Sequence, residues 1–120
     1  MPARQHRITR GDDYRRVVRG GARSGGAYCV MHVNAREDPS APARFGFIVS
    51  KAVGNAVTRN LVRRRMKAVA DHALQQGCAG ADVVIRALPA SAAADFGELQ
   101  HEILRLLAKL HRQQDRRVRS

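Results

Sequence analysis

The stretch that decides the fold is SKAVGNAVTRNLVRRRMK, residues 50–67. Gly54 interrupts the chain, and Asn55 is of the residue type that best caps the start of a helix. Gly77 is of the residue type that most often follows the last turn of a helix. The pattern therefore predicts a long helix that Asn55 begins and that runs to about Gln76.

This helix has two chemically different faces when its residues are placed about 100° apart. The apolar face, suited to packing on a sheet, holds Val62, Met66, Val69 and Ala73. The opposite face holds Arg59, Asn60, Arg63, Arg64 and Lys67. No acid occurs between Asp38 and Asp71, whereas a merely solvated helix face usually interleaves Glu with Lys or Arg to gain i,i+4 pairs. The acid-free face therefore indicates a polyanion as partner.

Composition supports the same partner for the chain as a whole. Lys and Arg total 22 against 10 acids, a formal net charge of +12, while 44% of the 120 residues are hydrophobic. Such a chain can form one small core, and its charge makes nucleic acid the leading candidate partner. We expect a single domain over residues 1–120, in which the polar, basic tail 113–120 frays.

Several other functional classes are disfavoured. No apolar run approaches the ~18 residues of a membrane helix, and no apolar signal core follows the N-terminus, so we expect a cytoplasmic protein with no membrane partner. Cys29 and Cys78 lack a CxxC spacing and are predicted to be reduced thiols. His101-Glu102 begins like a zinc-protease motif, but Arg105 stands where the second His is required. We expect that this chain has no catalytic residues and no metal ligands, and that it has no small-molecule substrate.

The remaining segments predict a mixed order of elements. Thr9 to Arg19 has the pattern of a short helix, followed by a glycine-rich loop. Segments 27–34 and 44–49 are strand-like and flank a turn-rich connector, which predicts an antiparallel pair. A buried strand is expected at 82–87, and a final helix after a capping-box-like Asp95 and Glu98. This order indicates an α+β fold, a mixed sheet packed with helices.

The central segment resembles the signature of the bacterial ribonuclease P protein family. The residues that carry the resemblance are Ser50-Lys51, Gly54-Asn55-Ala56-Val57, Arg59-Asn60 and Arg63-Arg64. Outside this segment it includes Tyr14 in the N-terminal helix, a glycine at Gly20 or Gly21, the strand end Arg86 to Ala90 and a leucine-rich last helix. The match extends over roughly Arg4 to Arg112.

The resemblance implies a fold and a function. The fold would be a compact domain with a left-handed βαβ crossover, similar to domain 2 of ribosomal protein S5. The chain would be the protein subunit of ribonuclease P, the endoribonuclease that removes the 5′ leader of precursor tRNA. Catalysis would reside in the RNA partner, with Mg²⁺ held mainly by RNA phosphates and no cofactor bound by the protein alone. The partners would be ribonuclease P RNA and precursor tRNA.

The resemblance also implies two groups of RNA-binding residues. The catalytic RNA would contact Lys51, Asn55, Arg59, Asn60, Arg63, Arg64 and Lys67. The 5′ leader cleft would be lined by Tyr14, Val18, Tyr28, Val30, His32, Phe47 and Val84. Leu61 stands where the family's Arg-Asn-Arg motif has its second Arg, which removes one contact. Val18 and His32 stand where the family often has aromatic residues, so the leader would be held more by charge than by base stacking.

The alternative function is that of a non-enzymatic small basic RNA-binding protein, such as a ribosomal protein or an RNA chaperone. Charge and fold class would be much the same in both cases. The feature that favours ribonuclease P is the motif of residues 50–64 together with the aromatic N-terminal helix and the strand end Arg86 to Ala90. A DNA-binding regulator is disfavoured because no helix-turn-helix pair occurs.

Overall fold

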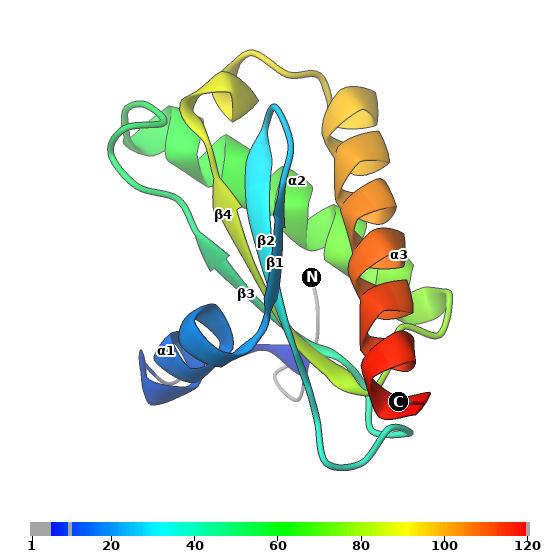
Figure 1. Cartoon of the computed structure of the whole chain (residues 1–120). Coiled ribbons are helices and arrows are strands. Elements are labelled where there is room, and N and C mark those ends of the chain that lie inside the picture. Colours follow the sequence, from blue (N-terminus) through cyan, green and yellow to red (C-terminus); the bar gives the residue numbers. More distant parts are fainter. Residues whose placement is uncertain (1–5, 10, 120) are drawn as a thin grey trace.

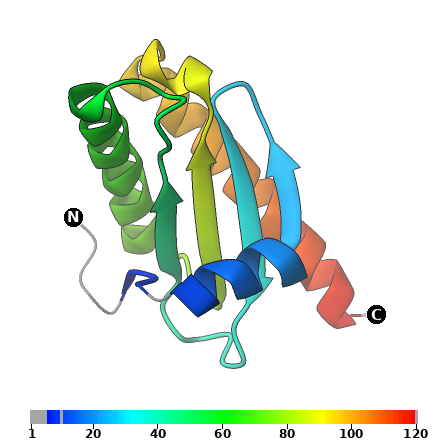
Figure 2. The same cartoon turned by 90° about the vertical axis from the view of Figure 1, so that its left-hand side faces the viewer.

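The computed structural model describes residues 6–9 and 11–119. In chain order its elements are α1 (Gly11–Gly20), β1 (Ala22–Gly25), β2 (Cys29–Ala35), β3 (Arg44–Ile48), α2 (Ala56–Gln75), β4 (Ala81–Ala87), the 3-10 helix η2 (Pro89–Ala92) and α3 (Phe96–Arg119). The strands form one sheet in the order β1-β2-β4-β3. α2 and α3 cover one face of this sheet, and α1 crosses the other (Figures 1 and 2).

The pairing of the strands differs from the expected hairpin. β2 pairs antiparallel with β1 and with β4, whereas β3 pairs parallel with β4. The predicted antiparallel pair of 27–34 with 44–49 is therefore wrong, because β4 lies between β2 and β3. The physical reason is the contiguous apolar run of β4: Val83, Val84 and Ile85 are all 0% exposed, which requires a central strand covered on both faces.

The connection from β3 through α2 to β4 has the unusual hand. In Figure 2, with α1 in front, β3 and β4 both point upward and β4 lies to the right of β3, while α2 lies behind the sheet. Seen from the side of α2, the chain therefore moves leftward, so the crossover is left-handed, against the usual right-handed rule. The predicted α+β fold with a left-handed βαβ crossover is confirmed.

The core is divided by the sheet into two unequal parts. The larger part lies between the sheet and the helices α2 and α3, and its fully buried side chains include Met31, Phe45, Met66, Ile85, Leu99, Ile103, Leu106 and Leu110. The smaller part lies under α1, where Val17 packs on Val84 and Ile8. α1 thus depends on a few contacts, whereas α2 and α3 are anchored by the main core.

The predicted helix ends are confirmed. The Asn55 side chain accepts a hydrogen bond of 2.9 Å from the Thr58 backbone N–H and caps α2. Gly77, with φ of 90°, follows the end of this helix. At the start of α3, the Glu98 N–H donates to the Asp95 carboxylate at 2.8 Å, and Asp95 N–H donates to the Glu98 carboxylate at 3.2 Å. This is the reciprocal capping box.

One segment departs from expectation. Ala22–Gly25 forms the edge strand β1 within the expected glycine loop; its alternating buried and exposed pattern rests on the small residues Ala22 and Ser24, which give little strand signal. Residues 113–119 have helical backbone at the end of α3, Ser120 lies outside the described residues, and the fraying of this tail stays a prediction. None of the helices in the described part has the length and apolarity needed to cross a membrane, and both cysteines are free thiols.

Candidate nucleic-acid interface

The α2 basic face, defined as Arg59, Asn60, Arg63, Arg64 and Lys67, is open to solvent. Asn60 and Arg64 are exposed, and the other three are half-buried. The opposite side of the helix is fixed in the main core, where Val62 is 1% and Met66 0% exposed. The sequence prediction of a two-faced helix is thus matched by the structure.

No carboxylate in the described part of the chain neutralises the cations of the α2 basic face. In residues 6–9 and 11–119, no carboxylate forms an ion pair with Arg59, Arg63, Arg64 or Lys67, while Arg16 and Arg44 both pair with Asp82 at 2.7 Å. Arg63 Nη1 donates only to the Asn60 side-chain oxygen, at 3.3 Å. The Arg59 Nε is buried and has no hydrogen-bond partner in that part of the chain.

Two further residues expected to contact the catalytic RNA lie just before α2. Lys51 is exposed in the turn that follows β3, and Asn55 is exposed at the helix N-terminus. The Asn55 oxygen already accepts the capping hydrogen bond from Thr58, so only its NH₂ group is free to donate. All seven expected residues therefore lie on α2 or the turn that leads into it.

Arg65 is engaged within the protein. Its Nη1 donates to the Ala94 carbonyl oxygen at 2.8 Å, which ties α2 to the segment before α3.

The opposite face of the sheet is organised in three rows across the strands, because paired residues point to the same side. The register places Asn34, Asp82 and Arg44 in one row, Arg23, His32, Val84 and Gly46 in the next, and Gly25, Val30, Arg86 and Ile48 in the third. We call these the Asp82 row, the Val84 row and the Arg86 row. α1 lies on the Val84 row, where Val17 covers Val84.

Beside α1, part of the sheet face remains accessible around the buried His32; we define the open sheet face as Val18, Arg23, Val30, His32, Ile48 and Arg86. Three expected leader residues belong to it: Val18 is 39% exposed, Val30 is half-buried and His32 is 7% exposed. Val84 lies on the same side but is 0% exposed beneath α1. It supports the helix and cannot touch a ligand, so its expected place in the cleft lining is wrong.

Tyr14 lies at the border of this face. Its ring is half-buried against Gly46, and its hydroxyl oxygen accepts a 3.2 Å hydrogen bond from the Phe47 backbone N–H. It also borders a hollow of about 190 Å³ that Arg63 and Lys67 line from α2. Tyr14 therefore lies between the α2 basic face and the open sheet face.

Phe47 and Tyr28 are not part of the expected cleft. Phe47 alternates with Gly46, so its side chain points to the other side of the sheet and packs on the main core. The Tyr28 hydroxyl donates to Glu98 of α3 at 2.7 Å, because the backbone N–H groups of 27–29 are held by Glu102 of the same helix. Both side chains lie on the face covered by α2 and α3, and their expected place in the cleft is wrong.

The sequence analysis missed Arg23 and Arg86, both exposed on the open sheet face. Burial, followed by the positive charges of Arg23 and Arg86, lowers the pKa of His32 below its usual value. His32 is therefore neutral at pH 7, and its Nδ1 has no partner within the described chain. Arg86 is two residues from Val84 on β4, so strand alternation places both on the same side of the sheet, and this spacing could have identified Arg86 from the sequence. Arg23 lies on β1, a strand that the sequence did not predict.

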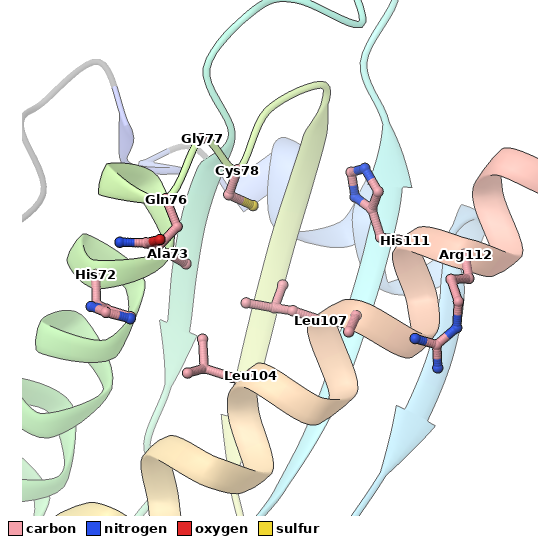
Figure 3. A pocket seen from close by; sticks show the side chains of 10 residues that line it. His72, Ala73, Gln76, Gly77, Cys78, Leu104, Leu107, His111 and Arg112 are labelled. Carbon is pink, nitrogen blue, oxygen red and sulfur yellow. The ribbon is translucent and has the colours of Figure 1, made fainter.

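A separate hollow of about 490 Å³ lies between the C-terminal half of α2 and α3 (Figure 3). His72 and Cys78 border it on one side and His111 on the other, around the apolar Leu104 and Leu107. Burial raises the pKa of the Cys78 thiol, so the group stays protonated at neutral pH. Within the described residues, no group of three His, Cys, Asp or Glu side chains could hold a metal ion.

An acid-free basic helix face and, on the other side of the sheet, an apolar face that carries two arginines are typical of a small nucleic-acid-binding domain. Residues 1–111 match the sequence profile of the family Ribonuclease P. The chain is 50% identical over 103 residues to the ribonuclease P protein component of Clavibacter michiganensis, covering 86% of this chain and 90% of that one. It is 43% identical over 102 residues to that of Kocuria rhizophila, covering 85% and 88%. The chain belongs to the ribonuclease P protein family.

Solved structures confirm the fold. The ribonuclease P protein of Staphylococcus aureus superimposes with a TM-score of 0.76 at 22% identity, over 88% of this chain and 96% of that one. The protein from Thermotoga maritima gives 0.76 at 20% identity, over 86% and 96%. By its family, the chain is a component of an endoribonuclease holoenzyme, a ribonucleoprotein of tRNA processing.

Proposed function

We propose that this chain binds the catalytic RNA of ribonuclease P through the α2 basic face and the 5′ leader of precursor tRNA on the open sheet face. The observation that carries the proposal is the set of unneutralised cations on α2. Like charges at helical spacing destabilise a helix, and RNA phosphates would relieve that repulsion while releasing counterions. Lys51 and Asn55 extend the contact before the helix.

We propose that the chemistry of cleavage belongs to the RNA partner. The buried carboxylates of the described chain, Asp82 and Glu102, are engaged by arginines and by backbone N–H groups respectively. They hold the fold together and are not free to act on a substrate. The protein would contribute positive charge, which lowers the Mg²⁺ concentration that the RNA requires, with the ions held mainly by RNA phosphates. The assembly would act in the cytoplasm.

The open sheet face would hold the single-stranded leader chiefly through its phosphates. Val30 and Ile48 give apolar surface on the two sides of Arg86 in the same row, and Arg23 adds a second positive charge in the neighbouring Val84 row. An aromatic platform contributes about 1–3 kcal/mol per stacked base, but Val18 provides none. Charge therefore dominates over stacking on this face.

Reconstitution with a bacterial ribonuclease P RNA tests the proposal. The protein should allow cleavage of precursor tRNA at physiological Mg²⁺, where the RNA alone is slow. Arg59→Ala and Arg63→Ala should each weaken association with the RNA without lowering the melting temperature, because neither side chain supports the core. Arg112→Ala, an exposed arginine on α3, is the matched control. Cleavage by RNA-free protein would refute the assignment of catalysis to the RNA.

A further inference from the structure

α1 is fixed to the sheet at three places along its length. Val17 lies against Val84 in the centre. The Tyr14 ring lies on Gly46 towards the N-terminal end. The third attachment is polar: Arg16 Nη2 donates to Asp82 Oδ2 at 2.7 Å.

Asp82 is held in place independently of α1. Its side chain is 1% exposed. Arg44 of β3 donates to both of its oxygens, from Nε to Oδ1 at 2.8 Å and from Nη2 to Oδ2 at 2.7 Å. Arg36, which follows β2, brings its Nε within 3.8 Å of Oδ1. The carboxylate is thus a fixed part of the sheet, and Arg16 is the group by which α1 reaches it.

The ion pair and the open sheet face lie on opposite sides of α1. The helix occupies the Val84 row, so the Asp82 row passes on one side and the Arg86 row on the other. Arg16 and Val18 are two residues apart, about 200° around a helix, and therefore flank Val17 on opposite sides. Arg16 reaches the Asp82 row, and Val18, 39% exposed, borders the open sheet face.

We infer that Asp82 is a positioning residue for leader recognition: through Arg16 it fixes the roll of α1 and so the distance of Val18 from the Arg86 row. The inference rests on the proposed function, in which the leader occupies this face. Without the ion pair, α1 rolls about the Val17 contact. Val18 then no longer holds its place against the strands, although the α2 basic face, on the other side of the sheet, is unaffected.

The test is the ratio of affinities for precursor and mature tRNA in the reconstituted holoenzyme. Asp82→Asn and Arg16→Gln should each reduce this ratio about three- to tenfold, the range expected when one residue acts through another. Association with the catalytic RNA should remain unchanged. The direction of the change in leader affinity is decisive for Asp82→Asn, because this variant loses one negative charge and its net charge therefore rises by one. If charge alone governed leader binding, the variant would bind more tightly; positioning requires weaker binding.

Two further measurements separate positioning from other causes. If Arg16 touched a leader phosphate itself, Arg16→Gln would reduce the salt slope of leader affinity by about 0.7, and the inference would be overturned; positioning leaves the slope unchanged. Arg16→Lys, which keeps the charge and one donor, should recover part of the ratio. If Asp82→Asn does not fold, Arg16→Gln decides alone, because both bonds from Arg44 stay in place.

The possible failures are distinguishable. A wild-type holoenzyme with no preference for precursor over mature tRNA would overturn the proposed leader site, and this inference with it. A wild-type preference that Arg16→Gln and Asp82→Asn both retain in full would overturn the positioning role alone.

Discussion

The ring of Tyr14 lies directly on the backbone of Gly46: a β-carbon added at Gly46 would stand 2.6 Å from the ring atoms Cε1 and Cζ. Any other residue at this position would therefore displace the ring. Because Tyr14 is one of only a few attachments of α1 in the described structure, the absence of a side chain at position 46 helps to determine where this helix lies.

Gly46→Ala should destabilise the protein by about 1–3 kcal/mol, the usual cost of forcing a methyl group into a packed site. Urea unfolding measures this loss. Gly20→Ala is the matched control, since a β-carbon there meets no atom within 4 Å, and it should leave stability unchanged or slightly higher. In a Tyr14→Ala background, Gly46→Ala should cost much less; an equal cost in both backgrounds would show that the ring is not what the methyl group meets.

Glu102 provides a second prediction, on the other side of the sheet. Its carboxylate accepts hydrogen bonds from the backbone N–H groups of Ala27, Tyr28 and Cys29, at 2.6, 2.8 and 2.9 Å. Glu102→Gln replaces one acceptor oxygen with an NH₂ group that faces these donors. We expect a loss of about 2 kcal/mol in unfolding free energy, because at least one of the three N–H groups is left without an acceptor.

The control for this variant is Glu37→Gln. Glu37 is exposed and has no ion pair in the described part of the chain, so its substitution should change the unfolding free energy by less than about 0.5 kcal/mol. Equal effects of the two variants would mean that the three hydrogen bonds of Glu102 do not hold the β1–β2 connection to α3.

The pH dependence of stability gives a third prediction. Burial alone would raise the pKa of Asp82, but the hydrogen bonds from Arg44 and Arg16 outweigh it and lower this pKa below its usual value. The ionised side chain therefore contributes stability that is fully present above the unfolded-state pKa of about 3.9. This contribution is lost as pH falls through the lower folded-state pKa.

The difference in unfolding free energy between the wild type and Asp82→Asn should thus be constant near pH 6 and shrink as pH falls from about 4. Urea titrations at a series of pH values measure it. A difference that grew on acidification would mean that the folded-state pKa is raised, and that burial outweighs the arginines.

Local patterns allowed much of this structure to be predicted, and long-range pairing accounts for most of the rest. The α2 basic face follows from helical spacing alone, and the Asn55 cap and the Asp95–Glu98 capping box from local chemistry. The position of β4 between β2 and β3 is a property of the whole sheet, and no local signal in 27–34 or 44–49 excludes a hairpin. Phe47 was misplaced because an aromatic strand residue fits either face until the register is known.

The partners of the two buried carboxylates are also set by long-range contacts. Asp82 lies 66 positions from Arg16 in the chain, and Glu102 lies 75 positions from Ala27. Spacing in the sequence cannot reveal such pairs; only the fold brings them together. They are also the contacts that orient α1 and the β1–β2 connection, so the detailed shape of the open sheet face required the structure.

The last prediction concerns how the open sheet face holds the leader. Binding of a single strand releases counterions, so log affinity falls with log salt at a slope of about −0.7 per neutralised phosphate. The preference for precursor over mature tRNA should therefore shrink as monovalent salt rises at fixed Mg²⁺. Arg23→Gln and Arg86→Gln should each make this slope shallower by about 0.7 if each contacts one phosphate, whereas Arg112→Gln should leave it unchanged.

Val18→Phe tests the complementary part of the same idea. Val18 borders the open sheet face and is 39% exposed, so a phenyl ring can be accommodated there without entering the core. The ring should add affinity of about 1–3 kcal/mol per stacked base, and the gain should be the same at low and high salt because stacking releases few counterions. A flat precursor preference across salt would contradict the charge-dominated face. A Val18→Phe variant altered only in stability would show that the leader does not pass beside α1.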